Sequence, residues 1–211
     1  MIAGAGPRGA ACSVRWGVHA WWGRAPATER AVVRDFRVVE LTASGLLLRP
    51  WNTTDAPAVL AAWHDPAIAL WNPQGDAFDL DAARQWVRWR ADWSQGTHVS
   101  LAVADPARPE IMLGSVSLHR IHGGDASIGY WTVAAARRRG LASAAVSRLT
   151  EWAFRDLGLH RIELCHAVAN PASCRVAERA GYPFEGTLRQ SHRYGDGRRH
   201  DEHLHARLAT D

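Results

Sequence analysis

The chain has 211 residues, of which 47% are hydrophobic and 22% charged, and its formal net charge is +4. This length suits one domain with a sizeable core and is short for two. Every basic residue is an arginine, and these are dispersed outside residues 137–139, whereas a nucleic-acid-binding protein needs a broad basic patch or stripe. No apolar run approaches the roughly 18 residues of a membrane-spanning helix. We therefore expect neither nucleic acid nor a membrane as a partner.

The cysteines indicate the cellular location, and the N-terminal composition indicates where the folded domain begins. Cys12, Cys165 and Cys174 are odd in number and have no paired spacing, so we expect reduced thiols and a cytoplasmic protein. Residues 1–45 show no sustained periodicity, and we expect a disordered N-terminal extension there. A substrate-gripping arm is the alternative for this extension. The folded domain is then expected over residues 46–208.

Turn residues and hydrophobic periodicity predict the elements of the first half of this domain. A strand over residues 45–50 is followed by a helix over residues 53–64, which an Asp-Pro pair ends. A second helix begins at Asp79 or Asp81 and runs to about residue 95. It carries tryptophans at i, i+3 and i+7 that share one face and are expected in the core: Trp86, Trp89 and Trp93.

The second half alternates strands and helices. Strands are expected over residues 98–104, 111–119, 127–133, 161–168, 185–194 and 200–208, with helices over residues 142–157 and 170–181. The order is β-α-α-β-β-β-α-β-α-β-β. It predicts a single mixed α/β domain.

The most informative segment joins the strand over residues 127–133 to the following helix. Arg137, Arg138, Arg139 and Gly140 form a turn at the helix N-terminus. Backbone N–H groups at such an end lack intrahelical partners and lie at the positive end of the helix dipole. The turn is therefore a candidate cradle for a pyrophosphate.

Three motifs carry a resemblance to a known family. The turn, continued to Ala142, fits the pattern Arg/Gln-x-x-Gly-x-Gly/Ala, and Gly129-Tyr130-Trp131 precedes it. Residues 170–182 fit Asn-x-x-Ser-x-x-x-x-Glu-x-x-Gly-Phe/Tyr. In these motifs and their spacing the chain resembles the GNAT (GCN5-related) N-acetyltransferases, and within them the RimJ/RimL-like branch, which acetylates amino groups from acetyl-CoA.

The resemblance implies a fold and a cofactor site. The sheet would be mostly antiparallel, with a central parallel pair of strands that splays apart and admits the pantetheine arm between residues 131–133 and 165–168. The backbone of residues 138–143 would bind the CoA pyrophosphate, and the Val133 backbone would help to hold the acetyl carbonyl. The residues expected to contact acetyl-CoA are Trp131, Thr132, Val133, Arg137, Arg138, Arg139, Gly140, Leu141, Ala142, Ser143, Asn170 and Ser173.

The implied catalytic residues depart from the family pattern at two positions. Many members have a tyrosine as general acid where this chain has Ala177, and Ser173 is the candidate in its place. The branch often has a glutamate as general base where this chain has Ser127. His119 is then the nearest titratable candidate for the base, with His122 as a further one.

The acceptor and the partners remain open at this stage. An α-amine, with a pKa near 7.7–8.0, is more often neutral at pH 7 than a lysine amine, which favours a protein or peptide N-terminus in a site without an obvious base. A small-molecule amine, such as an antibiotic or a metabolite, is the alternative acceptor, and a non-catalytic acyl-CoA sensor is the alternative to an enzyme. The protein is expected to be a monomer or homodimer.

A metal site is not expected. The C-terminal histidines are His200, His203 and His205, of which the last two share a strand face while His200 points the other way. No cysteine lies near them in the sequence, so the usual ligand spacing is missing.

Overall fold

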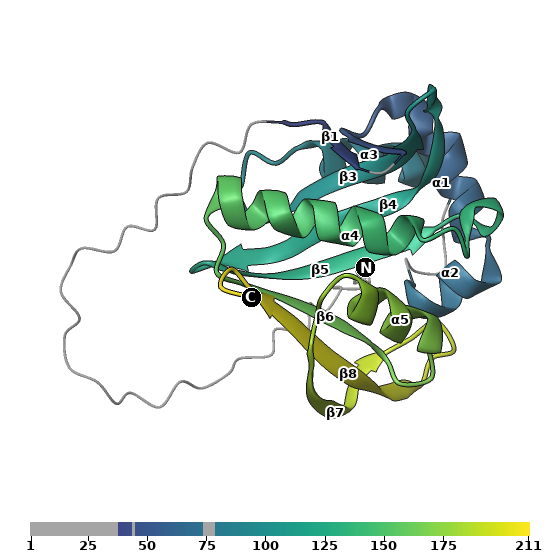
Figure 1. The fold of residues 1–211 in the computed structure, drawn as a ribbon. Coiled ribbons are helices and arrows are strands. Elements are labelled where there is room, and N and C mark those ends of the chain that lie inside the picture. The colour runs from purple at the N-terminus through teal and green to yellow at the C-terminus, as the bar shows by residue number, and fades with distance from the viewer. Residues whose placement is uncertain (1–37, 44, 74–78) are drawn as a thin grey trace, which may run out of the picture. The chain divides into compact units, whose positions relative to one another are not determined.

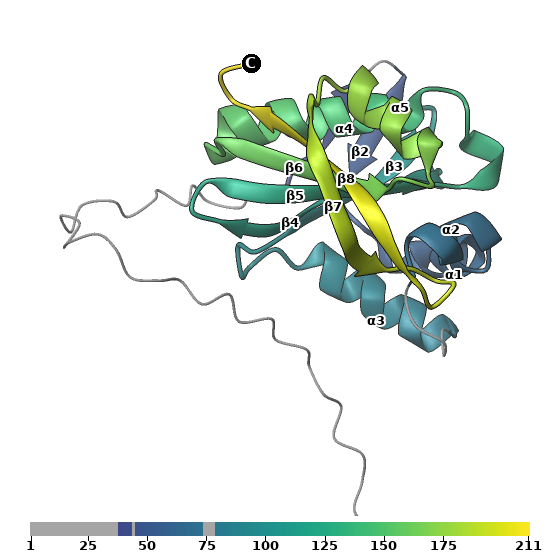
Figure 2. The same ribbon diagram turned by 90° about the horizontal axis from the view of Figure 1, so that it is seen from below.

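The computed structural model describes residues 38–43, 45–73 and 79–211, which form one sheet with helices on both faces (Figure 1, Figure 2). The strands are β1 Leu41–Ala43, β2 Leu46–Arg49, β3 Val99–Asp105, β4 Arg108–His122, β5 Asp125–Thr132, β6 Arg161–Ala167, β7 Phe184–Arg193 and β8 Arg199–Leu208. The helices are α1 Ala56–Trp63, α2 Pro66–Trp71, α3 Leu80–Ala91, α4 Leu141–Trp152 and α5 Pro171–Arg179. Short helical turns cover Thr53–Asp55 and Ala134–Ala136, and a π-helical segment, Ala153–Leu157, continues α4.

The sheet has eight strands in the order β1-β2-β3-β4-β5-β6-β8-β7. All neighbours are antiparallel except β5 and β6, which are parallel. Their parallel pairing covers only Asp125–Ser127 against Arg161–Glu163. Beyond Ser127 and Glu163 the two strands separate, so the predicted mixed α/β fold with a central splayed pair is confirmed.

Two hydrophobic cores lie on opposite faces of the sheet. One face is covered by α4 and α5 and contains Leu101, Leu118, Ile162 and Leu164. The other is covered by α1 and α3 and contains Val59, Val87, Ala102 and Trp131. Both faces of β3 are covered, so its residues Val99–Ala104 are all buried. Strands buried on both faces usually have nearly continuous apolar sequences.

Side-chain caps start the helices at the positions where the sequence places polar residues. The Asp79 carboxylate accepts from the Ala82 N–H at 2.8 Å, and Asn170 Oδ1 accepts from the Ser173 N–H at 3.3 Å. Asp65 Oδ1 accepts from Ala67 and Ile68 and begins α2, which Pro66 continues at the first helical position. From the sequence, Asp65 and Pro66 are expected only to end one helix, whereas in the structure they also start a second one.

Three further expectations need correction. Residues 41–43, assigned to the N-terminal extension, pair with β2 as an edge strand, while residues 1–37 and 44 lie outside the described residues. Helix α3 ends at Ala91, so Trp93 is buried from the loop that follows. Trp89, expected in the core, is 55% exposed and stacks on His98 with ring centroids 4.8 Å apart.

Among the described residues, no helix is long and apolar enough to cross a membrane.

A buried ion pair fixes the start of the α1–α3 layer. Arg49 Nη1 and Nη2 donate to Asp55 Oδ2 and Oδ1 at 2.8 and 2.7 Å, and the two residues are 9% and 3% exposed. Asp55 also accepts from the Asn52 N–H at 2.8 Å, while Asn52 Oδ1 accepts from Thr54, which together form a capping box. The carboxylate thus holds the end of β2 and the start of α1 in one arrangement.

Replacing Asp55 tests this role. Asp55→Asn leaves the buried Arg49 guanidinium without its charged partner, and breaking such a pair typically costs about 3–5 kcal/mol. We expect the free energy of unfolding, measured in urea, to fall by about 3 kcal/mol. Asp81→Asn, which removes an exposed pair with Arg84, is the control and should leave stability unchanged. Equal effects of the two variants would contradict the assignment.

Candidate active site

The turn before α4 presents free backbone donors. Arg138 and Gly140 adopt left-handed conformations with φ of 60° and 76°, which turns the chain sharply into the helix. The first intrahelical bond is donated by the Ala144 N–H to the Gly140 carbonyl at 3.1 Å. Among the described residues, none accepts from the N–H groups of residues 138–143. These donors point out of the helix N-terminus, which is the geometry that suits a pyrophosphate.

The three arginines of the turn have different surroundings. Arg137 Nε donates to the Thr132 carbonyl at 3.2 Å, and its Nη2 to Asp65 Oδ1 at 2.7 Å. This arginine therefore ties the turn to the N-terminus of α2. The side chains of Arg138 and Arg139 are exposed and free to approach an anion.

The gap between β5 and β6 exposes main-chain groups on both of its edges. Along a strand, N–H and C=O groups point alternately to the two neighbouring strands. The Val133 N–H donates to Leu113 of β4 at 3.0 Å and its carbonyl accepts from Ala136. The backbone N–H groups of Tyr130 and Thr132 therefore point into the gap. On the other edge the Val168 N–H donates to the Asp201 carbonyl of β8, so the backbone groups of Cys165 point into the gap.

This geometry revises one detail of the predicted site. Both polar backbone groups of Val133 are engaged within the protein, so its N–H is not free for an acetyl carbonyl. The neighbouring Thr132 N–H, on the gap side, is the better placed donor. The Trp131 side chain is buried in the core against α1 and α3 and does not enter the gap.

The N-terminus of α5 closes one end of the gap. Asn170 caps this helix, and the Ser173 hydroxyl, half-buried, has no hydrogen-bond partner among the described residues. The Tyr130 hydroxyl donates to the Ser173 carbonyl at 3.5 Å, and burial raises the pKa of Tyr130 to about 12. Two neutral hydroxyl groups, of Ser173 and Tyr130, therefore lie together here. Ala177, where the family tyrosine would be, is fully buried and offers no polar atom.

On the opposite face of the sheet, His119 lies under α3. Arg90 Nη1 approaches His119 Nδ1 at 3.3 Å, and because a guanidinium can only donate, Nδ1 is the acceptor and Nε2 carries the proton. Burial first, and then the Arg90 charge, lower the pKa of His119 to about 4. A neutral imidazole that presents an N–H is a hydrogen-bond donor and a weak base. Ser127 accepts from Arg120, and His122 is exposed at the end of β4.

Arg90 is itself held between two rings. Its guanidinium lies 4.8 Å from the ring centroids of both Trp86 and Trp89, a cation–π arrangement. Its buried Nε has no hydrogen-bond partner among the described residues. The exposure of Trp89 thus has a structural reason, since this ring covers the buried arginine rather than filling the core.

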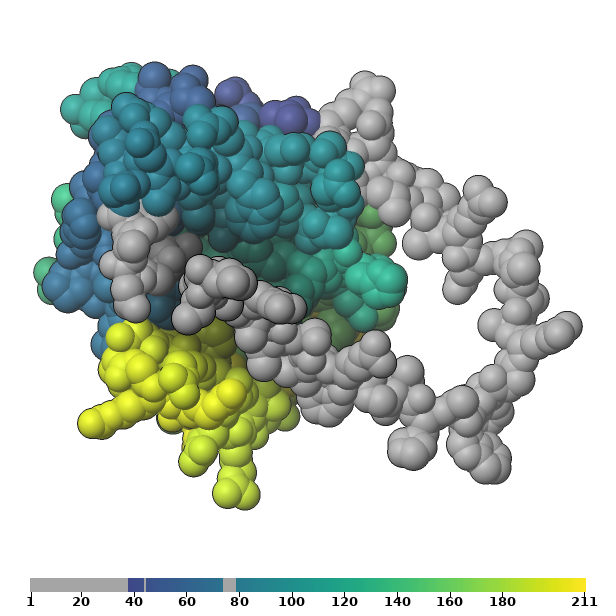
Figure 3. Space-filling model, turned by 180° about the vertical axis from the view of Figure 1, so that it is seen from behind, coloured from purple at the N-terminus to yellow at the C-terminus, as the bar shows by residue number. Residues whose placement is uncertain are grey.

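A carboxylate that the sequence analysis did not single out lies on the same face, across the gap. Glu202 of β8 pairs with Ala167 in the ladder and accepts from the Tyr194 and Ser191 hydroxyls at 2.8 and 2.7 Å. Burial, followed by the bond to Glu202, raises the pKa of Tyr194. Figure 3 shows this face hollowed between α3 and the β7–β8 strands. Glu202 and Arg90 therefore lie on one face of the sheet, on segments far apart in the sequence.

Two of the three C-terminal histidines lie close to other potential metal ligands in the structure. His200 Nε2 donates to Asp196 Oδ2 at 2.8 Å, and His200 lies apart from the other two. His203 and His205 meet His166 of β6 and Cys174 of α5 on the α5 face. No cysteine is near these histidines in the sequence, but the fold brings Cys174 close to His203 and His205, so the expectation that no cysteine lies nearby is wrong.

Comparison with known proteins identifies the family. The domain family described as "Acetyltransferase (GNAT) domain" matches residues 45–183. The chain therefore belongs to the GNAT acetyltransferase family. This agrees with the turn, the splayed strands and the α5 motif described above.

Individual relatives agree with this assignment. Over 92 residues the chain is 37% identical to YdaF of Bacillus subtilis (strain 168), whose name describes a ribosomal N-acetyltransferase, and the match covers 43% of this chain and 50% of YdaF. The match thus spans about half the length of that relative.

Solved structures share the fold. Ribosomal-protein-S5-alanine acetyltransferase from Vibrio fischeri superposes with a TM-score of 0.73 at 20% identity, covering 82% of this chain and 98% of that chain. Mycobacterium smegmatis RimJ, solved in complex with CoA-disulfide, gives a TM-score of 0.71 at 24% identity, covering 82% and 87%.

A glycine substitution tests the phosphate cradle. Gly140 has a positive φ and nothing within 4 Å of a Cβ built on it, so Gly140→Ala brings a backbone strain of about 1–2 kcal/mol and a methyl group beside the free N–H groups. We expect the dissociation constant for CoA, measured by calorimetry, to rise at least about tenfold. Gly158→Ala is the matched control, because Gly158 also has a positive φ and open space but ends the π-helical segment. Equal CoA binding by the two variants would contradict the cradle.

Proposed function

We propose that the protein transfers the acetyl group of acetyl-CoA to the α-amine of a protein or peptide N-terminus, by direct attack of the amine on the thioester. The observation that carries this proposal is the gap between β5 and β6, which has unpaired backbone groups on both edges and the N-termini of α4 and α5 at its open end. A chain of alternating amides, such as pantetheine, can pair with those edges. The RimJ and S5-alanine acetyltransferase structures that share the fold support a ribosomal protein as the acceptor.

The donor half of the site has defined roles. The N–H groups of residues 138–143 bind the pyrophosphate, and the exposed Arg138 and Arg139 add positive charge. The Thr132 N–H donates to the thioester carbonyl, where negative charge develops during attack. The Ser173 and Tyr130 hydroxyls lie at the α5 end and supply a proton to the departing thiolate.

The acceptor half lies in the recess on the other face. The Glu202 carboxylate, oriented by Tyr194 and Ser191, binds the incoming ammonium group and removes its proton. Arg90 and the Nε2–H of His119 are donors on the opposite wall. The backbone carbonyls that follow the N-terminal amine of a peptide can accept from these donors.

Proton energetics favour the same acceptor. With a pKa near 7.7–8.0, roughly a tenth of an α-amine is neutral at pH 7, whereas a lysine amine near 10.4 is neutral less than one part in a thousand. A single carboxylate base suits the more acidic ammonium, and His119, whose pKa burial lowers to about 4, is too weak a base to assist it. We assign His119 a donor role and propose Glu202 as the base in its place.

The described thiols favour direct attack over an acetyl-cysteine intermediate. Burial, and then the carboxylates of Glu202 and Glu163, raise the pKa of Cys165 to about 11. Burial also raises the pKa of Cys174. Neither is a ready nucleophile at neutral pH. Both are free thiols, as we expect in a cytoplasmic protein.

An acceptor panel tests the function. CoA release from acetyl-CoA would be measured with a lysine-free peptide that has a free N-terminus, the N-acetylated peptide with one lysine, and a polyamine. We expect kcat/KM at pH 7 to be at least about tenfold higher for the free N-terminus. A preference for the lysine peptide or the polyamine would contradict the α-amine. CoA binding without release of thiol from any amine would instead establish a non-catalytic sensor.

The same assay tests the proposed base. Glu202→Gln keeps the shape of the side chain and should lower kcat/KM about 100-fold, while the dissociation constant for CoA stays unchanged. Glu185→Gln, which alters an exposed pair with Arg161, is the control. If Glu202→Gln retains full activity, the carboxylate is not the base.

A further inference from the structure

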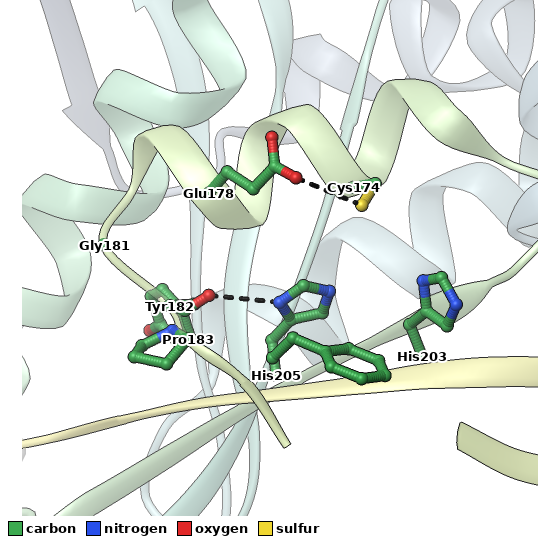
Figure 4. A pocket seen from close by; sticks show the side chains of 8 residues that line it. Cys174, Glu178, Gly181, Tyr182, Pro183, His203 and His205 are labelled. Atoms are coloured by element: carbon green, nitrogen blue, oxygen red, sulfur yellow. Dashed lines mark hydrogen bonds between the residues drawn. The ribbon is translucent and has the colours of Figure 1, made fainter. Parts of the chain in front are cut away.

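Four potential metal ligands from three elements meet on the α5 face of the sheet. They are His166 of β6, His203 and His205 of β8, and Cys174 of α5, and their ligand atoms all lie within 4.8 Å of one another. His166 and His205 are buried. Figure 4 shows His203 and His205 on β8 beneath Cys174, in a pocket that Tyr182 and Phe184 help to line.

The hydrogen bonds of two of the histidines determine which ring nitrogens carry protons. His166 Nδ1 lies 2.9 Å from the Ala167 carbonyl, and His205 Nδ1 lies 3.1 Å from the Tyr182 carbonyl. A carbonyl can only accept, so each Nδ1 carries the proton, and in the neutral rings each Nε2 has a lone pair. The two Nε2 atoms face each other at 3.4 Å.

A cation between the two Nε2 atoms would stabilise this arrangement. Two lone pairs at hydrogen-bond distance have no proton to share, so they repel unless a positive centre lies between them. Histidine ligands of metals usually donate their other N–H to a carbonyl or carboxylate in this way. His203 provides a second indication, because its buried Nδ1 has no hydrogen-bond partner among the described residues.

The fourth potential ligand, Cys174, lies above the histidines. Cys174 Sγ donates to Glu178 Oε1 at 3.6 Å, one helical turn along α5 (Figure 4). The ring of Phe184 lies against His203 and His205, with centroid distances of 5.0 and 5.6 Å, and shields them from solvent.

We propose that His166, Cys174, His203 and His205 bind one Zn²⁺ ion in a four-coordinate site. Zinc takes nitrogen and thiolate ligands tetrahedrally at about 2.0–2.1 and 2.3 Å, which places neighbouring ligand atoms about 3.3–3.6 Å apart. The Nε2 atoms of His166 and His205 already have this separation. On binding, the Cys174 thiol loses its proton, which Glu178 can accept and pass to solvent, and no electrons are transferred.

The ion would join α5 to β6 and β8. All four positions are protein ligands, so the site is structural rather than catalytic. Cys174 follows Ser173 directly, and the metal therefore fixes the first turn of the helix that closes the gap. The zinc site stands on its own geometry and does not depend on the proposed acetyl transfer.

Metal binding to the full, untagged chain tests the proposal. After treatment with a chelator, the protein would be titrated with Zn²⁺ against a competing chelator, and with Co²⁺ as a spectroscopic substitute. We expect one ion per chain, visible absorption of tetrahedral Co²⁺ and a thiolate-to-cobalt charge-transfer band. The midpoint of thermal unfolding should rise with Zn²⁺, because the ion binds the folded state.

Matched cysteine variants identify the ligands. Cys174→Ser should weaken Zn²⁺ binding at least about 100-fold and abolish the charge-transfer band, since losing a ligand costs no less than losing its supporting hydrogen bond. Cys165→Ser, on the opposite face of β6, should retain both. Circular dichroism of the chelated variants shows whether they fold. If Cys174→Ser does not fold, His203→Gln is read by the same titration and should lose affinity.

Three results would overturn the proposal. They are the absence of stoichiometric binding, weak binding of several ions that does not raise the unfolding midpoint, and equal affinity of the Cys174 and Cys165 variants. In the first case the 3.4 Å contact between His166 and His205 is bridged by an extra proton instead of a metal.

Discussion

The gap at the centre of the sheet exists because the parallel pairing of β5 and β6 is short. Only Asp125–Ser127 pair with Arg161–Glu163, and the strands then part although both continue for several residues. Unpaired backbone groups inside a protein are costly unless a ligand or water satisfies them. A site for an extended amide chain therefore follows from the break itself, before any side chain is considered.

The surrounding elements give this gap two distinct sides. On the α4 and α5 side lie the free N–H groups of the turn at Gly140 and the hydroxyls of Ser173 and Tyr130. On the α1 and α3 side lie Arg90, His119 and Glu202. This separation matches a reaction between two substrates, because donor and acceptor can enter from opposite faces and meet at the gap. The ion pair of Arg49 with Asp55 supports the acceptor side by fixing the start of α1.

Much of the fold and of the donor site follows from local sequence. The strand, turn and helix around Gly140 are encoded by neighbouring residues, and the cap at Asn170 likewise acts on its own helix. Helix α2 has its signal in Asp65 and Pro66, since the same pair that stops one helix can start another. Trp89 was misassigned because helical spacing alone cannot distinguish a core face from a face that covers a buried arginine.

The proposed acceptor residues and metal ligands could not be predicted from local sequence. Glu202 lies about 110 residues from Arg90 in the chain, and only the sheet brings them to one face. His166, Cys174 and His205 likewise come from three elements, and no ligand spacing links them in the sequence. The alternation of β8 assigned His203 and His205 to one face correctly, but their partners come from β6 and α5.

Amide hydrogen exchange on adding CoA shows whether the cofactor enters the gap between β5 and β6. If the cofactor pairs with the open edges of β5 and β6, the N–H groups of Tyr130, Thr132 and Cys165 become protected, while the Val133 N–H, already bonded to Leu113, changes little. Protection that is confined to other parts of the chain, with these three amides unchanged at saturating CoA, would contradict the account.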